Sequence, residues 1–201
     1  RDLITRYHTM ADLFARADGK IRVLDVGCGP GLFLDFIKQY TPEKNITYTG
    51  VDISPEMIAA AKQRHPEATF HCLDLLEEKL PDEYDFTVVN GVFTIKETIP
   101  HEDMKKFYQQ LLNACYKKTR QGLAANFMTK FVDWEKDRLF HLPIDDFCSF
   151  AVKDLSRHIT IRHDYGLWEY TAYVYREPLA PLDEEKDNAF MRLVSGESDG
   201  S

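Results

Sequence analysis

Three glycines and two acids near the start of the chain have the types and spacing of a nucleotide-binding turn. In the segment VLDVGCGPGLFL, Asp25 precedes Gly27 by two residues, and Gly29 and Gly31 follow. Because glycine lacks a Cβ atom, its backbone takes positive φ and a ligand can approach closely, while the next helix offers unpaired N–H groups. Asp52 ends the following apolar run, where a carboxylate can accept both hydroxyls of a ribose. These residues predict a site for an adenosine-containing cofactor.

The spacing of the glycines separates two classes of cofactor. A dinucleotide-binding turn reads G-x-G-x-x-G, whereas here an acid is followed by G-x-G-x-G. In this turn the sequence resembles the class I S-adenosylmethionine-dependent methyltransferases, whose first motif has that form. An acid at Asp52 is also expected of nicotinamide enzymes, so an NAD(P)-dependent oxidoreductase stays an alternative. A non-catalytic partner that binds S-adenosylmethionine or S-adenosylhomocysteine is a third interpretation.

The resemblance covers about residues 20 to 177 and includes two further strand ends. In the family, residues matching Asp74 and Leu75 hold the adenine ring, and the segment matching Asn90 to Phe93 lines the methionine end of the cofactor and the substrate entrance. The resemblance therefore implies S-adenosylmethionine as cofactor and S-adenosylhomocysteine as product. It implies the cofactor-binding residues Asp25, Gly27, Cys28, Gly29, Gly31, Asp52, Ile53, Met57, Asp74, Leu75, Asn90, Gly91 and Val92.

The acceptor is expected to be a small molecule. Enzymes of this family that methylate nucleic-acid amines carry Asn or Asp followed by Pro-Pro and an aromatic residue, whereas this chain has Asn90-Gly91-Val92-Phe93. A net charge of −8 and a pI near 5.4 also argue against a nucleic-acid partner. Several loops look similar to small bacterial methyltransferases of surface-polysaccharide or secondary-metabolite pathways. We therefore expect transfer to oxygen or nitrogen of a small metabolite, such as a sugar-linked or secondary-metabolite intermediate.

Candidate catalytic residues follow from the rule that ligands bind beyond the carboxyl ends of parallel strands. His163 shares its expected strand face with Ile159 and Ile161, and the pKa of histidine suits a general base for a hydroxyl acceptor. Asp164 and Tyr165 follow it and are further catalytic candidates, although both residue types are common in turns. Each candidate also has an ordinary structural interpretation. Substrate contacts are expected from Phe93, Lys96, Trp134 and His141.

Alternating apolar runs and amphipathic segments must position these residues. Strands are expected at 21–26, 46–51, 69–73, 85–90 and 122–128, with a final hairpin of 158–163 and 169–175. Helices are expected at 3–14, 31–40, 55–64, 102–117 and 144–154. The pattern predicts a Rossmann-like, doubly wound α/β sheet of seven strands, mostly parallel, with an antiparallel strand in the C-terminal hairpin. The apolar stripe from Met104 to Cys115 is expected to be core rather than a cofactor contact.

Composition fits a soluble chain of one domain. Of the 201 residues, 44% are hydrophobic, and no apolar run approaches the 18 or so residues of a membrane span. We expect residues 1–178 to form a single methyltransferase domain, with an N-terminal helix in 1–19 that covers the site. Residues 179–201 are expected to be an acidic extension with a disordered end at 195–201. The four cysteines lack metal-ligand spacing, which predicts no metal, and reduced thiols are typical of a cytoplasmic protein. A monomer or homodimer is expected.

Overall fold

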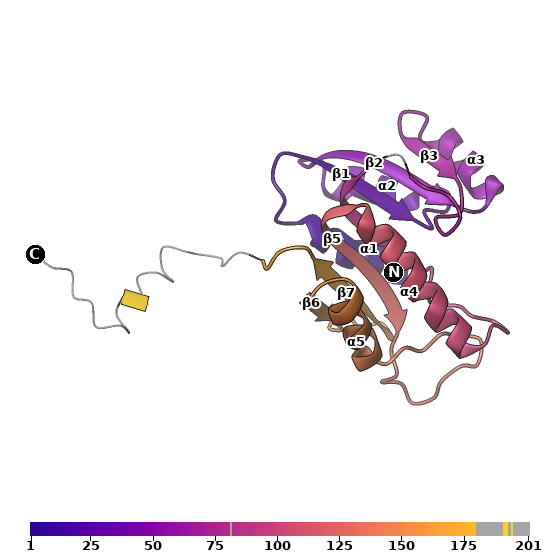
Figure 1. Cartoon of the computed structure of the whole chain (residues 1–201). Helices are drawn as coiled ribbons and strands as arrows, with labels where there is room; N and C mark the ends of the chain where they lie inside the picture. The colour runs from indigo at the N-terminus through magenta and orange to yellow at the C-terminus, as the bar shows by residue number, and fades with distance from the viewer. Residues whose placement is uncertain (81, 180–190, 193, 195–201) are drawn as a thin grey trace, which may run out of the picture.

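One sheet of seven strands runs through the molecule (Figure 1). The computed structural model describes residues 1–80, 82–179, 191–192 and 194. The strands are β1 (Lys20–Val26), β2 (Asn45–Asp52), β3 (Thr69–Cys72), β4 (Tyr84–Val89), β5 (Thr119–Met128), β6 (His158–Arg162) and β7 (Glu169–Tyr175). Their order is β3-β2-β1-β4-β5-β7-β6, and β7 runs in the opposite direction to the other six strands. The predicted α/β fold is confirmed.

Helices cover both faces of the sheet. The α-helices are α1 (Asp2–Ala11), α2 (Leu32–Tyr40), α3 (Pro55–Arg64), α4 (His101–Lys117) and α5 (Ile144–Asp154), and a short 3-10 helix, η1 (Asp12–Phe14), follows α1. Residues of α1, α2 and α3 pack into one buried cluster, and residues of α4 and α5 pack into another (Figure 1). The first three helices therefore lie on the opposite face of the sheet from the last two.

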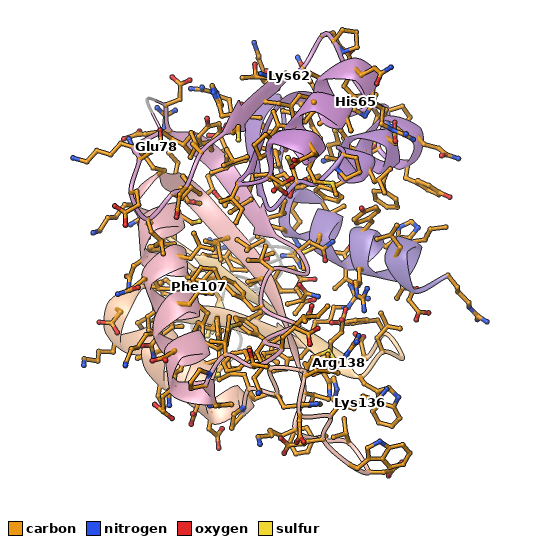
Figure 2. All side chains as sticks on the ribbon, turned by 90° about the vertical axis from the view of Figure 1, so that its right-hand side faces the viewer. Lys62, His65, Glu78, Phe107, Lys136 and Arg138 are labelled. Carbon is orange, nitrogen blue, oxygen red and sulfur yellow. The ribbon has the colours of Figure 1, made fainter. Side chains whose placement is uncertain are left out.

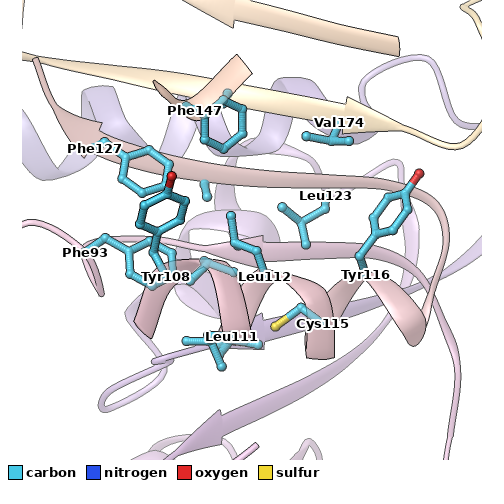
Figure 3. Packing of buried hydrophobic residues seen from close by; sticks show 14 of the residues in the cluster. Phe93, Tyr108, Leu111, Leu112, Cys115, Tyr116, Leu123, Phe127, Phe147 and Val174 are labelled. Atoms are coloured by element: carbon cyan, nitrogen blue, oxygen red, sulfur yellow. The ribbon is translucent and has the colours of Figure 1, made fainter. Parts of the chain in front are cut away.

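Side chains along β5 alternate between the two faces of the sheet, so this strand contributes residues to both buried clusters. Leu123, Ala125 and Phe127 pack with α4 and α5, whereas Ala124 packs on the other face. Figure 3 shows Phe127 of β5 beside Tyr108 of α4, and Leu123 of β5 closer to Tyr116 near the end of that helix. All four side chains are fully buried, so the apolar character of this strand on both faces follows from its central place in the sheet.

Local sequence signals set the start of α3. The Oγ of Ser54 accepts a hydrogen bond from the N–H of Met57 at 3.3 Å, and Pro55 occupies the first helical position. Because this helix begins directly after β2, it fixes the chain direction immediately beyond Asp52.

Two expectations differ from the structure in detail. Strand β6 ends at Arg162, so His163 lies outside the strand and is exposed rather than inward-facing beside Ile161. The expected helix over 3–14 is an α-helix only to Ala11 and continues as η1. The expected disordered end at 195–201 and most of the acidic extension lie outside the described residues. Among the described helices, none has the length and apolar character needed to cross a membrane.

Candidate active site

The glycine turn after β1 is bent against the end of β2. The N–H groups of Gly27 and Cys28 donate to the carbonyl oxygen of Val51 at 2.8 and 3.1 Å, and Gly27 and Gly29 take φ values of 74° and 52°. A Cβ atom on Gly27 would lie 2.4 Å from the Cγ2 of Val92, whereas one on Gly29 would meet nothing within 4 Å. The turn is thus tightly packed on one side and open at Gly29, as a cradle for a ligand requires.

Asp52 connects this turn to the start of α3. One carboxylate oxygen accepts the N–H of Gly29 at 2.9 Å, and the other accepts the N–H of Ser54 at 2.9 Å. Each oxygen has a second lone pair, so the carboxylate can still accept hydrogen bonds from a ligand. Asp52 is half-buried at the carboxyl edge of the sheet.

A cavity with an empty volume of ≈ 510 Å³ lies beside Asp52. It brings together six of the predicted cofactor-binding residues: Gly27, Asp52, Ile53, Asp74, Leu75 and Val92. The Oδ1 of the exposed Asp74 accepts the N–H of Leu76 at 2.8 Å, which fixes this carboxylate at the mouth of the cavity. An apolar slot with a carboxylate on either side has the chemistry to hold an adenosine group.

Helix α4 supplies part of this cavity, which the sequence analysis missed. Phe107 and Leu111 line it, although the stripe from Met104 to Cys115 was expected to be core only. Phe107 is half-buried, and its position on α4 is labelled in Figure 2. Its partial exposure could not be read from a helical period, which gives the direction of a side chain and not what covers it.

Asp25 lies beneath the turn rather than in the cavity. It is 2% exposed, and one of its oxygens accepts the hydroxyl of Tyr48 at 2.6 Å. Burial raises the pKa of this carboxyl to about 7, while the Tyr48 hydrogen bond acts in the opposite direction and the charge of Asp52 raises it further. Asp25 therefore supports the turn from below.

The remaining predicted cofactor residues surround the cavity without lining it. Cys28 is buried, and desolvation raises the pKa of its thiol. Gly31, at φ 80°, accepts a hydrogen bond through its carbonyl oxygen from the buried ring of His65 at 3.1 Å. The other predicted cofactor residues outside this lining are Gly29, Met57, Asn90 and Gly91.

Two amides meet at the carboxyl ends of β4 and β5. The Oδ1 of Asn126 accepts the N–H of Gly91 at 2.7 Å. Among the described residues, the Nδ2 of Asn126 and the Oδ1 of Asn90 are buried without a hydrogen-bond partner. A buried donor and acceptor left open cost free energy unless a ligand satisfies them. They stand at the strand end where the resemblance places the methionine end of the cofactor.

A second cavity, with an empty volume of ≈ 530 Å³, opens beyond the end of β5. Two predicted substrate residues, Trp134 and His141, line it together with Met128, Val132, Leu139 and Trp168. Thr129 links Trp168 and His141, which both line the cavity. Its N–H donates to the carbonyl oxygen of Trp168 at 3.2 Å, and its carbonyl oxygen accepts from the His141 ring at 2.6 Å. Figure 2 shows Lys136 and Arg138 on the loop of this cavity, far from His65.

The other two predicted substrate residues lie outside this cavity. Phe93 is 0% exposed, and its ring stacks on Phe127 with centroids 5.2 Å apart, so it is a core residue in this structure (Figure 3). Lys96 is half-buried, and its backbone N–H donates to Arg138 at 2.9 Å. An aromatic residue directly after a strand end gives no sign in sequence of whether it turns inward or outward.

The three predicted catalytic residues lie together on the turn between β6 and β7, apart from the lining of the second cavity. His163 is exposed, and its ring centroid is 6.1 Å from that of Phe131. Asp164 accepts from Arg162 at 2.8 Å, a hydrogen bond that lowers the pKa of its carboxyl. The hydroxyl of Tyr165 lies 3.0 Å from Thr171 Oγ1, and desolvation raises the pKa of Tyr165, which keeps the phenol protonated and unable to accept a proton as a phenolate.

An ion pair that the sequence analysis did not find ties α1 to the sheet. Both oxygens of Glu169, which is 1% exposed, accept from the Nε of Arg6, at 2.8 and 2.9 Å. Glu169 is the first residue of β7 and lies opposite Met128, so the pair stands at the edge of the sheet where β5 ends. The partners are 163 positions apart in the sequence, so no local pattern could have predicted the pair.

Comparisons with known proteins agree with this geometry. The methyltransferase domain family matches residues 23–118. A protein of Mycobacterium tuberculosis that is named as a methyltransferase is 28% identical over 155 residues, which are 75% of this chain and 90% of that protein. The malonyl-[acyl-carrier protein] O-methyltransferase of Acetivibrio thermocellus is 36% identical over 86 residues, or 42% of this chain, and the match spans only 29% of the relative's own length.

A solved structure supports the fold. The magnesium protoporphyrin IX methyltransferase from Synechocystis PCC 6803, crystallised with S-adenosylmethionine, aligns with a TM-score of 0.62 at 19% identity, covering 86% of this chain and 78% of that one. The fold, the glycine turn and these matches define a class I methyltransferase. Together these findings support an S-adenosylmethionine-dependent methyltransferase with S-adenosylmethionine as its cofactor. The predicted family, enzyme class and cofactor are confirmed.

Proposed function

We propose that this enzyme transfers a methyl group to an oxygen or nitrogen atom of a small-molecule acceptor bound in the cavity beyond β5. The supporting observation is how close that cavity is to the one beside Asp52. Val92 lines the cavity beside Asp52, and Ile95 pairs with Leu139, which lines the other. Three residues of chain span at most about 10 Å and Cα atoms paired across a bridge lie about 5 Å apart, so Val92 and Leu139 are within about 15 Å of each other, a distance that one bound cofactor and acceptor can cover.

In this proposal different residues along the sheet edge bind different parts of the cofactor. Asp52 accepts the ribose hydroxyls, and Asp74 with Leu75 holds the adenine. Asn90 and Asn126 satisfy their open acceptor and donor with the ammonium and carboxylate of the amino-acid end. The bound cofactor supplies a methyl carbon that is already electrophilic, so the protein's main task is to align the nucleophile and exclude water.

His141 is our proposed proton acceptor. Its Nδ1 donates to the carbonyl oxygen of Thr129 at 2.6 Å, so its Nε2 carries the lone pair, which accepts a long hydrogen bond of 3.4 Å from the N–H of Lys136. The carbon–sulfur bond breaks and its electron pair stays on sulfur. A carbon–oxygen or carbon–nitrogen bond forms, and the acceptor's proton goes to Nε2. His163 stays a candidate at the exposed turn, with Asp164 and Tyr165 beside it.

Oxygen is the first acceptor atom to test. Several curated relatives are named as malonyl-[acyl-carrier protein] O-methyltransferases, although the matches span about a third or less of their length. We propose a small molecule rather than a nucleic acid because the chain carries a net charge of −8. We further propose that it is a cytoplasmic monomer or homodimer, which sedimentation of the full chain can test for assembly.

A two-stage experiment tests the proposal. Calorimetric titration with S-adenosylhomocysteine, S-adenosylmethionine and NADH comes first, and binding of the first two but not NADH is expected. Incubation with S-adenosylmethionine and a panel of hydroxyl and amine metabolites follows, with S-adenosylhomocysteine and methylated products measured by mass spectrometry. Turnover above the rate without acceptor supports the proposal. Tight S-adenosylhomocysteine binding with no turnover over the whole panel would instead favour a non-catalytic binding partner.

A further inference from the structure

Both tryptophans of the chain converge on the cavity beyond β5. Trp134 comes from the loop after β5, and Trp168 comes from the turn that precedes β7. They are 71% and 62% exposed and are the two tryptophans in the 201-residue sequence. Large apolar side chains that gather at a cavity and stay exposed mark a binding site more often than a structural one.

The walls between the indoles are apolar. Met128, Val132 and Leu139 line the cavity together with the two indoles, and they contribute no hydrogen-bonding side chain apart from the weakly accepting sulfur of methionine. The ionisable groups in the wall are Asp133, Lys136 and His141. One carboxylate and one ammonium group leave no excess of either charge, so the lining does not select a strongly anionic or cationic ligand.

Apart from the indole N–H groups, only three side chains of the lining, Asp133, Lys136 and His141, can partner the hydroxyls of a sugar. A sugar presents hydroxyls around its whole edge and needs a partner for each that is buried, whereas this lining offers mainly indole, thioether and aliphatic surface. An aromatic ring has the opposite requirement, because its faces gain from indole and sulfur contacts and only its substituents need polar partners.

We propose that the acceptor carries its nucleophilic hydroxyl or amino group on a planar, largely apolar aromatic ring held by Trp134 and Trp168. This inference rests on the proposed function and narrows its acceptor class. The ring lies against the indoles and Met128, and its substituent faces His141. A sugar-linked acceptor, which the sequence analysis allowed, is the competing outcome.

Calorimetric titration of the full chain, saturated with S-adenosylhomocysteine, tests this. The probes are 2-naphthol, as a planar aromatic hydroxyl, and D-glucosamine, as a polar sugar of similar reach. We expect saturable binding of 2-naphthol and none of D-glucosamine. Trp134→Ala and Trp168→Ala should each weaken 2-naphthol binding about 3- to 10-fold, the effect of losing one aromatic contact. Tryptophan emission of the unaltered chain should change in parallel with the heat.

Phe131→Ala is the matched control. Phe131 lies on the same loop and is 66% exposed, like Trp134, but does not line the cavity. Its removal should leave 2-naphthol affinity unchanged. The inference is overturned if 2-naphthol does not bind, if it binds both tryptophan variants as tightly as the unaltered chain, or if D-glucosamine binds instead. Each of these results leaves S-adenosylhomocysteine binding intact, whereas loss of that binding in the unaltered chain would contradict the proposed function itself.

Discussion

The carboxylate of Asp52 holds the backbone N–H of Gly29 at 2.9 Å, across the gap between the ends of β2 and β1. The same side chain accepts the N–H of Ser54, so one residue fixes the glycine turn and the start of α3 together. Asp52, which we propose as the ligand of the ribose hydroxyls, therefore also shapes the glycine turn.

Removing the Asp52 carboxylate should weaken cofactor binding strongly. Asp52→Ala loses both backbone bonds and the proposed ribose contacts, and we expect S-adenosylhomocysteine affinity to fall about 10- to 100-fold, since hydrogen bonds to charged groups are worth about 1.5–3 kcal/mol. Asp52→Asn keeps one accepting oxygen and should lose less. Glu56→Gln removes a nearby exposed carboxylate on α3 and should bind normally in the same calorimetric titration. Equal affinities for all three variants would contradict this assignment.

Gly27 should tolerate a side chain far less well than Gly29. A Cβ on Gly27 would lie 2.4 Å from Val92 and would also force alanine to positive φ, and we expect Gly27→Ala to lower the free energy of unfolding by about 2–4 kcal/mol. A Cβ on Gly29 would meet no atom within 4 Å, so Gly29→Ala should lower the free energy of unfolding only by the cost of positive φ for alanine, about 1–2 kcal/mol. Gly27→Ala with Val92→Ala should recover part of the loss in urea unfolding. No recovery would mean that the Val92 contact is not the cause.

Six residues of the cavity beside Asp52 could be predicted because they lie at or just after strand ends. Asp52, Asp74 and Val92 each follow an apolar run, and parallel strands bring such ends to one edge. The acceptor half depends on how loops fold back. Phe93 turns into the core, Trp168 joins Trp134, and Glu169 pairs with a residue of α1, and none of these follows from a local period. The fold is set by periodicity and spacing, whereas these contacts are set by tertiary packing.

Asp25 should make the stability of the chain depend on pH. Its folded pKa is raised from 3.8 to about 7, so between these values the folded state keeps a proton that the unfolded state has lost. Stability contributed by the neutral carboxyl is complete below about pH 4 and is lost as the pH rises towards 7. Between pH 5 and pH 8 the unaltered chain should lose on the order of a few kcal/mol of unfolding free energy that Asp25→Asn keeps, as measured by urea unfolding at both pH values. Asp137→Asn, at an exposed position, should show no such difference. The same pH slope in Asp25→Asn and the unaltered chain would exclude Asp25 as its source.

His141 and His163 can be separated by matched substitutions. With an acceptor from the metabolite panel, His141→Gln should lower kcat about 100-fold and remove the acidic limb of the pH–rate profile, as expected for loss of a general base. His163→Gln should stay within about twofold, because His163 is exposed on the turn and does not line the cavity. S-adenosylhomocysteine affinity and Tm report whether His141→Gln also disturbs the loop through Thr129. The reverse pattern, with only His163→Gln inactive, would restore the candidate named from sequence.

The Arg6–Glu169 pair should control how firmly α1 covers the sheet edge. Glu169 is 1% exposed and Arg6 is 32% exposed, so losing one partner leaves a charge poorly solvated. Partial solvent screening at Arg6 reduces the cost, and we expect Glu169→Gln to lower the free energy of unfolding by about 1–3 kcal/mol. Amide exchange in residues 2–11 should accelerate more than in α4, because one tie of α1 to β7 is weakened. The Tyr173 hydroxyl, which donates to Thr9 at 2.7 Å, forms a second tie, so Tyr173→Phe should add to the effect. Unchanged exchange in α1 for both variants would show that the helix is held by its apolar contacts with α2 alone.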